Sequence, residues 1–131
     1  MPVNAMHWAD RNLRTLGDFD AFVFGDATWT ASEASNSAQR LAAALIEMGL
    51  APSDRVLMWM PNSPDLVIAW RAVIRAGGVT VVAHNDAPLK RIEQIAAETS
   101  PSAIITTHSI GTELSAPTLR HRIQCRNDER L

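Results

Sequence analysis

The 131-residue chain lacks several features that mark whole classes of protein. Its single cysteine, Cys125, excludes an intramolecular disulfide and fits a reducing compartment. Because the formal net charge is only -2, no basic surface argues for binding to nucleic acid or to anionic membranes. No apolar run approaches the roughly 20 residues of a membrane span, and Asp10 and Arg14 interrupt what a signal peptide would need. The sequence therefore predicts a cytoplasmic protein without a membrane span.

The residues that are present have the composition of a globular domain. Hydrophobic residues make up 47% of the chain and charged residues 20%, which argues against disorder. The length is enough for one domain with a real core and short for a multi-domain enzyme.

Residues 55–83 organise the predicted fold. Residues 56–60 are apolar without alternation, which is typical of a strand buried on both faces of a parallel sheet. A Pro-Asn-Ser-Pro turn follows at 61–64, and a mostly apolar helix is predicted over 64–76. Gly77 and Gly78 end that helix, and 79–83 form a second apolar strand. This is a strand–helix–strand unit of an α/β protein.

The helix over 64–76 carries more apolar surface than one neighbour can cover. After its first turn only Arg71 and Arg75, four residues apart, offer a solvated stripe. A helix this apolar is usually buried on more than one side. We therefore expect the chain to self-associate or to form part of something larger.

The flanking segments extend the same pattern. The sequence predicts a hairpin from 21–24 and 28–30, a helix capped by Thr30 and Glu33 that ends at Gly49, a helix over 88–98, and a third strand over 103–106. The fold class is thus α/β, an incomplete three-layer parallel sheet with helices on its faces. We divide the chain into an N-terminal arm or short helix (1–20), a partial domain (21–107) and a poorly packed tail (108–131), where the apolar pattern is lost.

Two loops are candidate ligand sites, because open α/β sheets bind ligands at the carboxyl ends of their strands. At 61–64, the amides of a helix start could act with Asn62 and Ser63, but ordinary helix capping explains the same residues. Asp65 in the first turn also argues against an anion there. At 84–86, His84 beside Asp86 could be a base or a metal ligand. No His or Cys at a metal-like spacing and no assignable nucleophile supports this, so a loop histidine without a catalytic role is favoured.

The remaining candidates have structural explanations. Gly77 and Gly78 close a helix, whereas phosphate-binding glycines open one, so we expect a helix cap with tight packing. Cys125 lies next to Arg126, but nothing else indicates a thiol enzyme. The tryptophans are predicted to pack in the core or the hairpin rather than to stack on bases; they are Trp8, Trp29, Trp59 and Trp70.

An ordered set of segments carries a family resemblance. The set comprises 28–30 (Thr-Trp-Thr), 37–45, 48–56, 60–63 (Met-Pro-Asn-Ser), 75–79 (Arg-Ala-Gly-Gly-Val) and the helix over 89–100. With these, residues 24–107 resemble the beginning of the AMP-forming adenylate ligases, which include acyl-CoA synthetases, luciferases and nonribosomal-peptide adenylation domains. Ser53 stands where the family usually has glycine, and Ala83 and Asp86 stand where it usually has prolines.

The resemblance implies an activity that this chain does not carry alone. The full-length family uses ATP, Mg and CoA to convert a carboxylic (fatty) acid into an acyl adenylate and usually a CoA thioester. Its Ser/Thr/Gly-rich ATP loop ending in Pro-Lys-Gly, its ribose-binding Asp and its catalytic Lys have no counterpart in these 131 residues. We therefore assign no catalytic, cofactor-binding or metal residue here and expect no cofactor for this chain alone. The sequence predicts a truncated ligase that is inactive alone; the alternative is a non-catalytic module that docks onto a partner or onto a separately encoded remainder.

Overall fold

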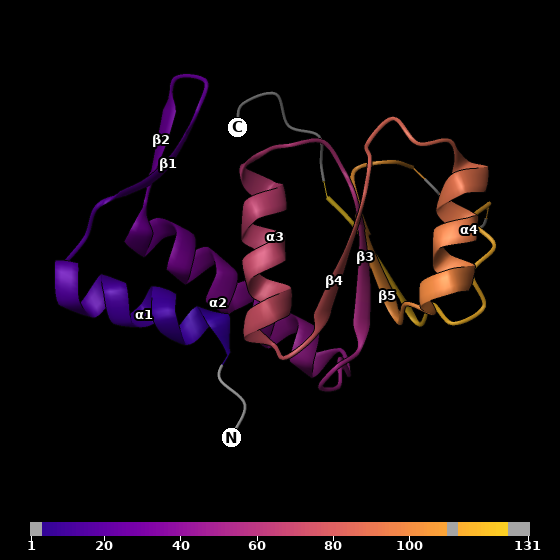
Figure 1. The fold of residues 1–131 in the computed structure, drawn as a ribbon, viewed down its shortest axis with the longest axis horizontal. Coiled ribbons are helices and arrows are strands. Elements are labelled where there is room, and N and C mark those ends of the chain that lie inside the picture. Colours follow the sequence, from indigo (N-terminus) through magenta and orange to yellow (C-terminus); the bar gives the residue numbers. More distant parts are fainter. Residues whose placement is uncertain (1–3, 110–112, 126–131) are drawn as a thin grey trace.

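The computed structural model describes residues 4–109 and 113–125 and has the predicted α/β architecture (Figure 1). Its elements, in chain order, are α1 (Ala5–Leu16), β1 (Asp20–Phe24), β2 (Ala27–Thr30), α2 (Ala31–Glu47), β3 (Arg55–Trp59), α3 (Pro64–Arg75), β4 (Val79–Ala83), α4 (Leu89–Thr99), β5 (Ala103–Thr106) and β6 (His121–Gln124). The predicted hairpin is β1–β2. Thr30 and Glu33 form the expected capping box at the start of α2.

The main sheet has four parallel strands in the order β4-β3-β5-β6. Strand β3 is central, since Met58 lies beside Val82 of β4 on one side and beside Ile105 of β5 on the other. Its residues Val56, Leu57 and Met58 are 0% exposed. The apolar run at 56–60 thus belongs to a strand that is buried on both faces of the sheet, as predicted.

Successive β3 side chains enter two separate cores. Val56 and Met58 pack with residues of α2 and α3 in one core, whereas Leu57 and Trp59 pack with residues of α4 in the other. Figure 1 shows α3 and α4 on opposite sides of the sheet, with α1 and α2 beyond α3. The predicted three-layer arrangement is confirmed.

The N-terminal segment is a helix that docks on α3. Asn4 caps α1 and also donates from Nδ2 to the carbonyl of Ile74 at 2.6 Å. Both terminal nitrogens of Arg75 bind the carboxylate of Asp10, at 2.6 and 3.0 Å. The hydrogen bond from Arg75 lowers the pKa of Asp10 below its usual range.

Helix α3 is largely covered by this chain itself. Ile68, Ala69, Ala72 and Val73 are buried, and the last three pack with residues of α2 and of the sheet. Trp70, by contrast, remains 40% exposed. Most of the apolar surface that seemed in excess is therefore used within the fold, and what remains exposed is confined to one side.

The prediction of a poorly packed tail over 108–131 is wrong for residues 113–125. Strand β6 extends the sheet, with Ile123 beside Ile105 of β5, and Leu114 is only 1% exposed in the core under α4. An edge strand needs only every second side chain to be half buried, so its polar sequence carries no recognisable apolar pattern. The remainder of that predicted tail, apart from residues 108 and 109, lies outside the described residues.

The turn between α2 and β3 contains a strained residue. Ser53 has φ of 69°, in the left-handed region that favours glycine, and its amide donates to the carbonyl of Gly77 at 2.9 Å. This explains why the resembled family usually has glycine at this position. The departure noted in the sequence therefore has a cost in backbone strain.

We expect Ser53→Gly to stabilise the chain. Relief of left-handed strain exceeds the added entropy of the unfolded chain, so the free energy of unfolding should rise by about 0.5 to 1 kcal/mol. Urea unfolding followed by circular dichroism measures the change. The matched control Ser37→Gly, in the middle of α2, should instead destabilise the chain by about the same amount. If both substitutions lowered the free energy of unfolding, backbone strain at Ser53 would be excluded.

Candidate functional site at the carboxyl edge of the sheet

The connections of the sheet create a crevice between the carboxyl ends of β3 and β4. Strand β3 leads into α3 on one face, and β4 leads into α4 on the other. The chain therefore leaves these neighbouring strands in opposite directions. Open α/β sheets bind ligands at such a point, outside the carboxyl ends of the strands.

A cavity of about 390 Å³ occupies this crevice. Both loops predicted from the sequence line it: Pro61 and Asn62 follow β3, and His84 and Asn85 follow β4. The rest of the lining is apolar and comes from Met60, Leu66, Val82 and Ala83. The topology thus brings together two loops that lie more than twenty residues apart in the sequence.

The capping explanation holds for part of the first loop. The hydroxyl of Ser63 accepts from the amide of Leu66 at 3.2 Å, and Pro64 and Asp65 occupy the first turn of α3. Ser63, Pro64 and Asp65 start the helix and are not among the described residues that line the cavity. Asn62 is different, because it lines the cavity and is exposed.

Asn85 is held in place by a closed set of contacts at the strand ends, which we call the Trp59–Asn85 network. Its carbonyl accepts from the indole Nε1 of Trp59 at 3.1 Å, and its side-chain Oδ1 pairs with Nε2 of His108 at 2.9 Å. The His108 ring stacks on Trp59, with centroids 3.9 Å apart. Thr106 closes the set: its hydroxyl donates to the carbonyl of Trp59 at 2.6 Å and accepts from the amide of His108.

The cavity lining contains groups for recognition rather than for chemistry. His84 accepts at Nδ1 from the amide of Asp86 at 3.2 Å, so the neutral ring carries its proton on Nε2. Among the described residues, no Asp, Glu, Lys, Arg, Ser or Cys lines the cavity. Across residues 4–109 and 113–125, no cluster of His, Cys, Asp and Glu could hold a metal ion. The described lining residues can hydrogen-bond to a ligand and cover its apolar surface, but none of them is a nucleophile such as Ser or Cys.

Cys125 is not an activated thiol. Its side chain is half buried, and burial, with a smaller effect from the charge of Asp65, raises the pKa of the thiol above its usual range. Arg126, which we considered as an activating neighbour, lies outside the described residues. The partial burial of Cys125 agrees with the prediction that it is not the reactive cysteine of a thiol enzyme.

The glycine pair and two of the tryptophans behave as predicted. Gly77 has φ of 86° just after the C-cap of α3, and a Cβ on Gly78 would lie 3.0 Å from Val73 Cγ1. Trp59 is buried, and Trp29 stacks on Phe22 in the hairpin. For the other two the prediction of packing is wrong: Trp8 is 60% and Trp70 40% exposed, because α1 and α3 turn these positions away from their neighbours.

Sequence reasoning missed Thr106 and His108. The available signal was their place at the carboxyl end of the third predicted strand, the same place that identified His84 after the second. We considered that edge only for the first two strands. The pairing of His108 with Asn85, 23 residues away, follows from the parallel register of β3, β4 and β5.

A family model described as "AMP-binding enzyme" matches residues 9–130. An octahydro-indenyl-propanoyl:CoA ligase of Mycobacterium tuberculosis is 39% identical over 72 residues, which are 55% of this chain and 14% of that protein. A dimodular nonribosomal peptide synthase of Bacillus subtilis is 34% identical over 80 residues, which are 61% of this chain and 3% of that protein. The chain thus spans a small part of the length of these relatives.

Solved structures share the fold. NpsA of Klebsiella oxytoca, solved with 3-hydroxyanthranilyl-AMSN, matches with a TM-score of 0.82 and 22% identity over 94% of this chain and 25% of that one. A benzoate CoA ligase of Burkholderia xenovorans matches with a TM-score of 0.73 and 25% identity over 80% of this chain and 22% of that one. The three-layer arrangement therefore recurs in longer proteins.

We expect Asn85 and His108 to be energetically coupled. Asn85→Ala leaves a His108 nitrogen unpaired. His108→Phe keeps the stacking on Trp59 but leaves the Asn85 side-chain amide unpaired. Each substitution should therefore lower the free energy of unfolding by about 1 to 2 kcal/mol. The double variant should lose less unfolding free energy than the sum of the two single variants, and the difference, the coupling energy, should be about 0.5 to 1.5 kcal/mol. Urea unfolding of the four proteins measures this. Asn62→Ala, on the exposed part of the cavity, is the control and should change stability by less than about 0.5 kcal/mol. Additive effects of the first two substitutions would exclude the network as a coupled unit.

Proposed function

This chain belongs to the AMP-binding enzyme family, and we propose that it is the N-terminal part of an ATP-dependent carboxylate–CoA ligase. The observation that carries the proposal is the family match over residues 9–130, joined to a parallel sheet with helices on both faces. In the full enzyme, a carboxylic acid and ATP would form an acyl adenylate, and CoA would then take the acyl group as a thioester. ATP, Mg and CoA are cofactors and co-substrates of that whole enzyme.

The class of carboxylic acid is the finer part of the proposal. We favour a fatty acid or a related carboxylate with CoA as acceptor, which the similarity to the mycobacterial CoA ligase supports. The similarity to peptide synthases supports a second possibility, in which a carrier protein accepts the acyl group in place of CoA. The cytoplasmic location stays a prediction from the sequence.

We further propose that the 131 residues do not form an acyl adenylate by themselves. The described residues that line the cavity at the carboxyl edge include no Lys or Arg for phosphate oxygens and no carboxylate for Mg²⁺. The family's ATP loop and catalytic lysine have no counterpart in the sequence. The chain then contributes scaffold and part of a binding crevice to a larger enzyme.

We expect the purified chain to give no carboxylate-dependent exchange between ATP and labelled pyrophosphate. Exchange requires the triphosphate-binding groups that these residues lack, so the signal should equal the rate without acid. A panel of fatty, aromatic and amino acids covers the substrate classes, and an intact adenylating enzyme serves as the positive control. Acid-dependent exchange that survives repeated purification would refute the inactive-fragment proposal and leave the family assignment intact.

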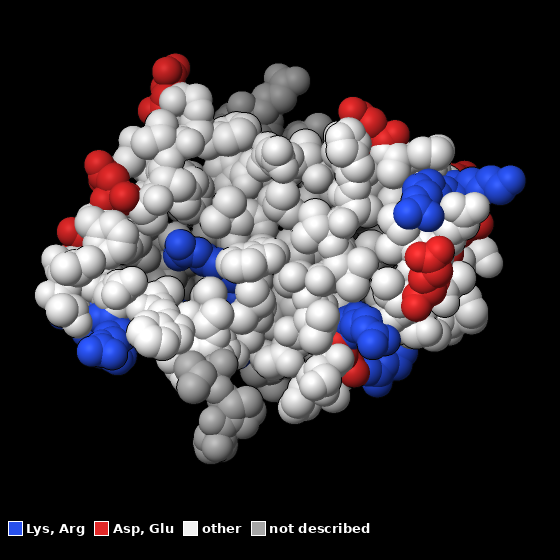
Figure 2. Space-filling model, viewed as in Figure 1, with Lys and Arg blue, Asp and Glu red and all other residues white. Residues whose placement is uncertain are grey.

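A second candidate function is docking onto another polypeptide, and the exposed edge of the sheet favours it. Strand β4 is an edge strand among the described residues, and Val79 and Val82 on it are 46% and 56% exposed. Trp70 on the adjoining α3 is 40% exposed. In the view of Figure 2 the surface is mostly uncharged, with a Lys or Arg side chain left of the centre and further charged residues nearer the rim. An unpaired, apolar edge is a template for a strand from a partner or from the remainder of the enzyme.

If this edge docks, the isolated chain should self-associate through it as concentration rises. Light scattering coupled to size-exclusion chromatography would show the mass increasing, and Val82→Lys should return it to that of a monomer, because a charge on the edge opposes pairing. Val23→Lys is the matched control, since Val23 is 66% exposed but lies on the separate hairpin. A folded wild-type monomer at all concentrations, without binding of a hydrophobic dye, would count against docking.

A further inference from the structure

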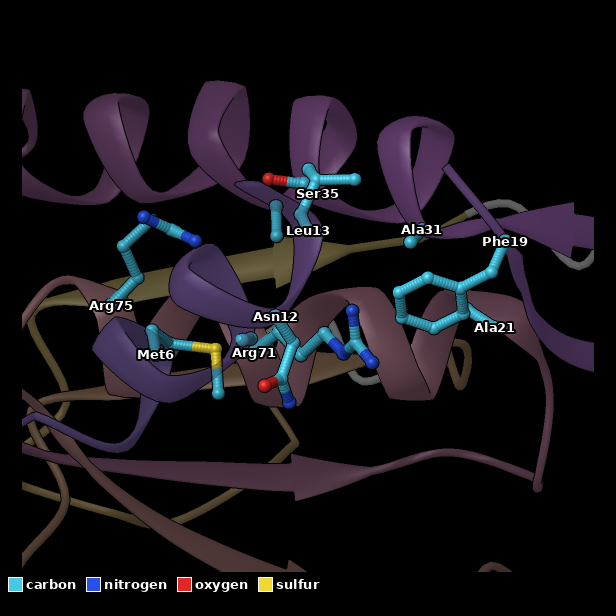
Figure 3. A pocket seen from close by; sticks show the side chains of 11 residues that line it. Met6, Asn12, Leu13, Phe19, Ala21, Ala31, Ser35, Arg71 and Arg75 are labelled. Atoms are coloured by element: carbon cyan, nitrogen blue, oxygen red, sulfur yellow. The ribbon is translucent and has the colours of Figure 1, made fainter. Parts of the chain in front are cut away.

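A second cavity, of about 240 Å³, lies among α1, α2, α3 and the start of the hairpin (Figure 3). Within the described part of the chain, it shares no lining residue with the cavity at the carboxyl edge of the sheet. Two arginines of α3, Arg71 and Arg75, line it together with the amide of Asn12 and the hydroxyl of Ser35. No acidic residue is among the described residues that line it, so the cavity wall they form is positive and polar on one side.

The two arginines differ in how they are paired. Arg75 holds Asp10 with both terminal nitrogens, but its Nε is buried and has no hydrogen-bond partner among the described residues. Arg71 lies one turn earlier on the same face of α3 and forms no hydrogen bond or ion pair with the part of the chain that the structure describes. Figure 3 shows its guanidinium beside Asn12 and extending towards Phe19.

The charge balance of the cavity therefore favours an anion. Asp10 neutralises Arg75, which leaves the half-buried Arg71 as an uncompensated positive charge at the cavity. A guanidinium removed from water gains most from a carboxylate or phosphate, whose two oxygens match its parallel N–H groups.

The rest of the cavity lining favours a ligand with an apolar part. Met6 of α1 is 6% exposed, and Leu13 and several alanines complete a wall without charge. Phe19 is 41% exposed and lies on the same lining. The volume is below the ≈300–1,000 Å³ typical of sites for drug-sized ligands, so the occupant is small.

From these observations we propose that the cavity binds a small monocarboxylate with a compact apolar body, such as a single-ring aromatic acid. The carboxylate binds the guanidinium of Arg71, and the ring packs against Met6 and Leu13. The inference rests on the charge and shape of this cavity and stands independently of the proposed ligase activity. An inorganic anion would satisfy Arg71 but would leave the apolar wall uncovered.

Titration of the complete 131-residue chain with benzoate tests the proposal, by calorimetry and by amide NMR. We expect saturable 1:1 binding, with the largest shifts at the amides of Asn12 and Ser35. Arg71→Gln should weaken binding by about tenfold or more, because it removes a charge-assisted hydrogen bond. Arg91→Gln, an exposed arginine on α4 across the sheet, is the matched control and should leave the affinity unchanged.

Two further ligands and one further variant make the outcome decisive. Benzyl alcohol, which has the ring without the charge, should not bind measurably, and inorganic phosphate should bind far more weakly than benzoate. Ala9→Leu fills the cavity from α1 and should abolish binding while Arg71 is retained. Unsaturable benzoate binding, equal affinity for phosphate, or an unchanged affinity in Arg71→Gln or Ala9→Leu would overturn the proposal.

Discussion

Burial of strand β3 on both faces is the constraint on which the other elements depend. Val56, Leu57 and Met58 are withdrawn completely from water, and each such side chain contributes about 1.5 to 3 kcal/mol when it is buried. Burial on two faces requires a helical layer on each side of the sheet. The connections through α3 and α4 supply those layers, on opposite faces, and so produce the crevice between β3 and β4.

The crevice has the location of a ligand site and the lining of only part of one. Its amides, imidazole and apolar side chains suit recognition, and the Trp59–Asn85 network holds one of the amides in a fixed position. The chain spans 14% of the mycobacterial CoA ligase to which it is similar, and its fold corresponds to 25% of the solved NpsA chain.

Helix α3 illustrates how one apolar element serves several surfaces. Its inner side packs on the sheet and on α2, while Arg75 at its end holds α1 through Asp10. That docking leaves Arg71 facing a cavity without an anionic partner among the described residues. Trp70 is the large apolar side chain of α3 that stays exposed. The fold thus uses most of the apolar surface of α3 and leaves Trp70 exposed.

The sequence by itself determined the elements whose causes are local. The capping box at Thr30, the apolar run of β3 and the left-handed turns at Gly49 and Gly77 follow from neighbouring residues, and they placed β3, α3 and β4 correctly. Only the tertiary structure decided what depends on distant partners. Strand β6 exists because β5 offers it an edge, and His108 meets Asn85 because three parallel strands end together. Such contacts leave no periodic signal, since each requires only one or two side chains to match a surface that the rest of the fold creates.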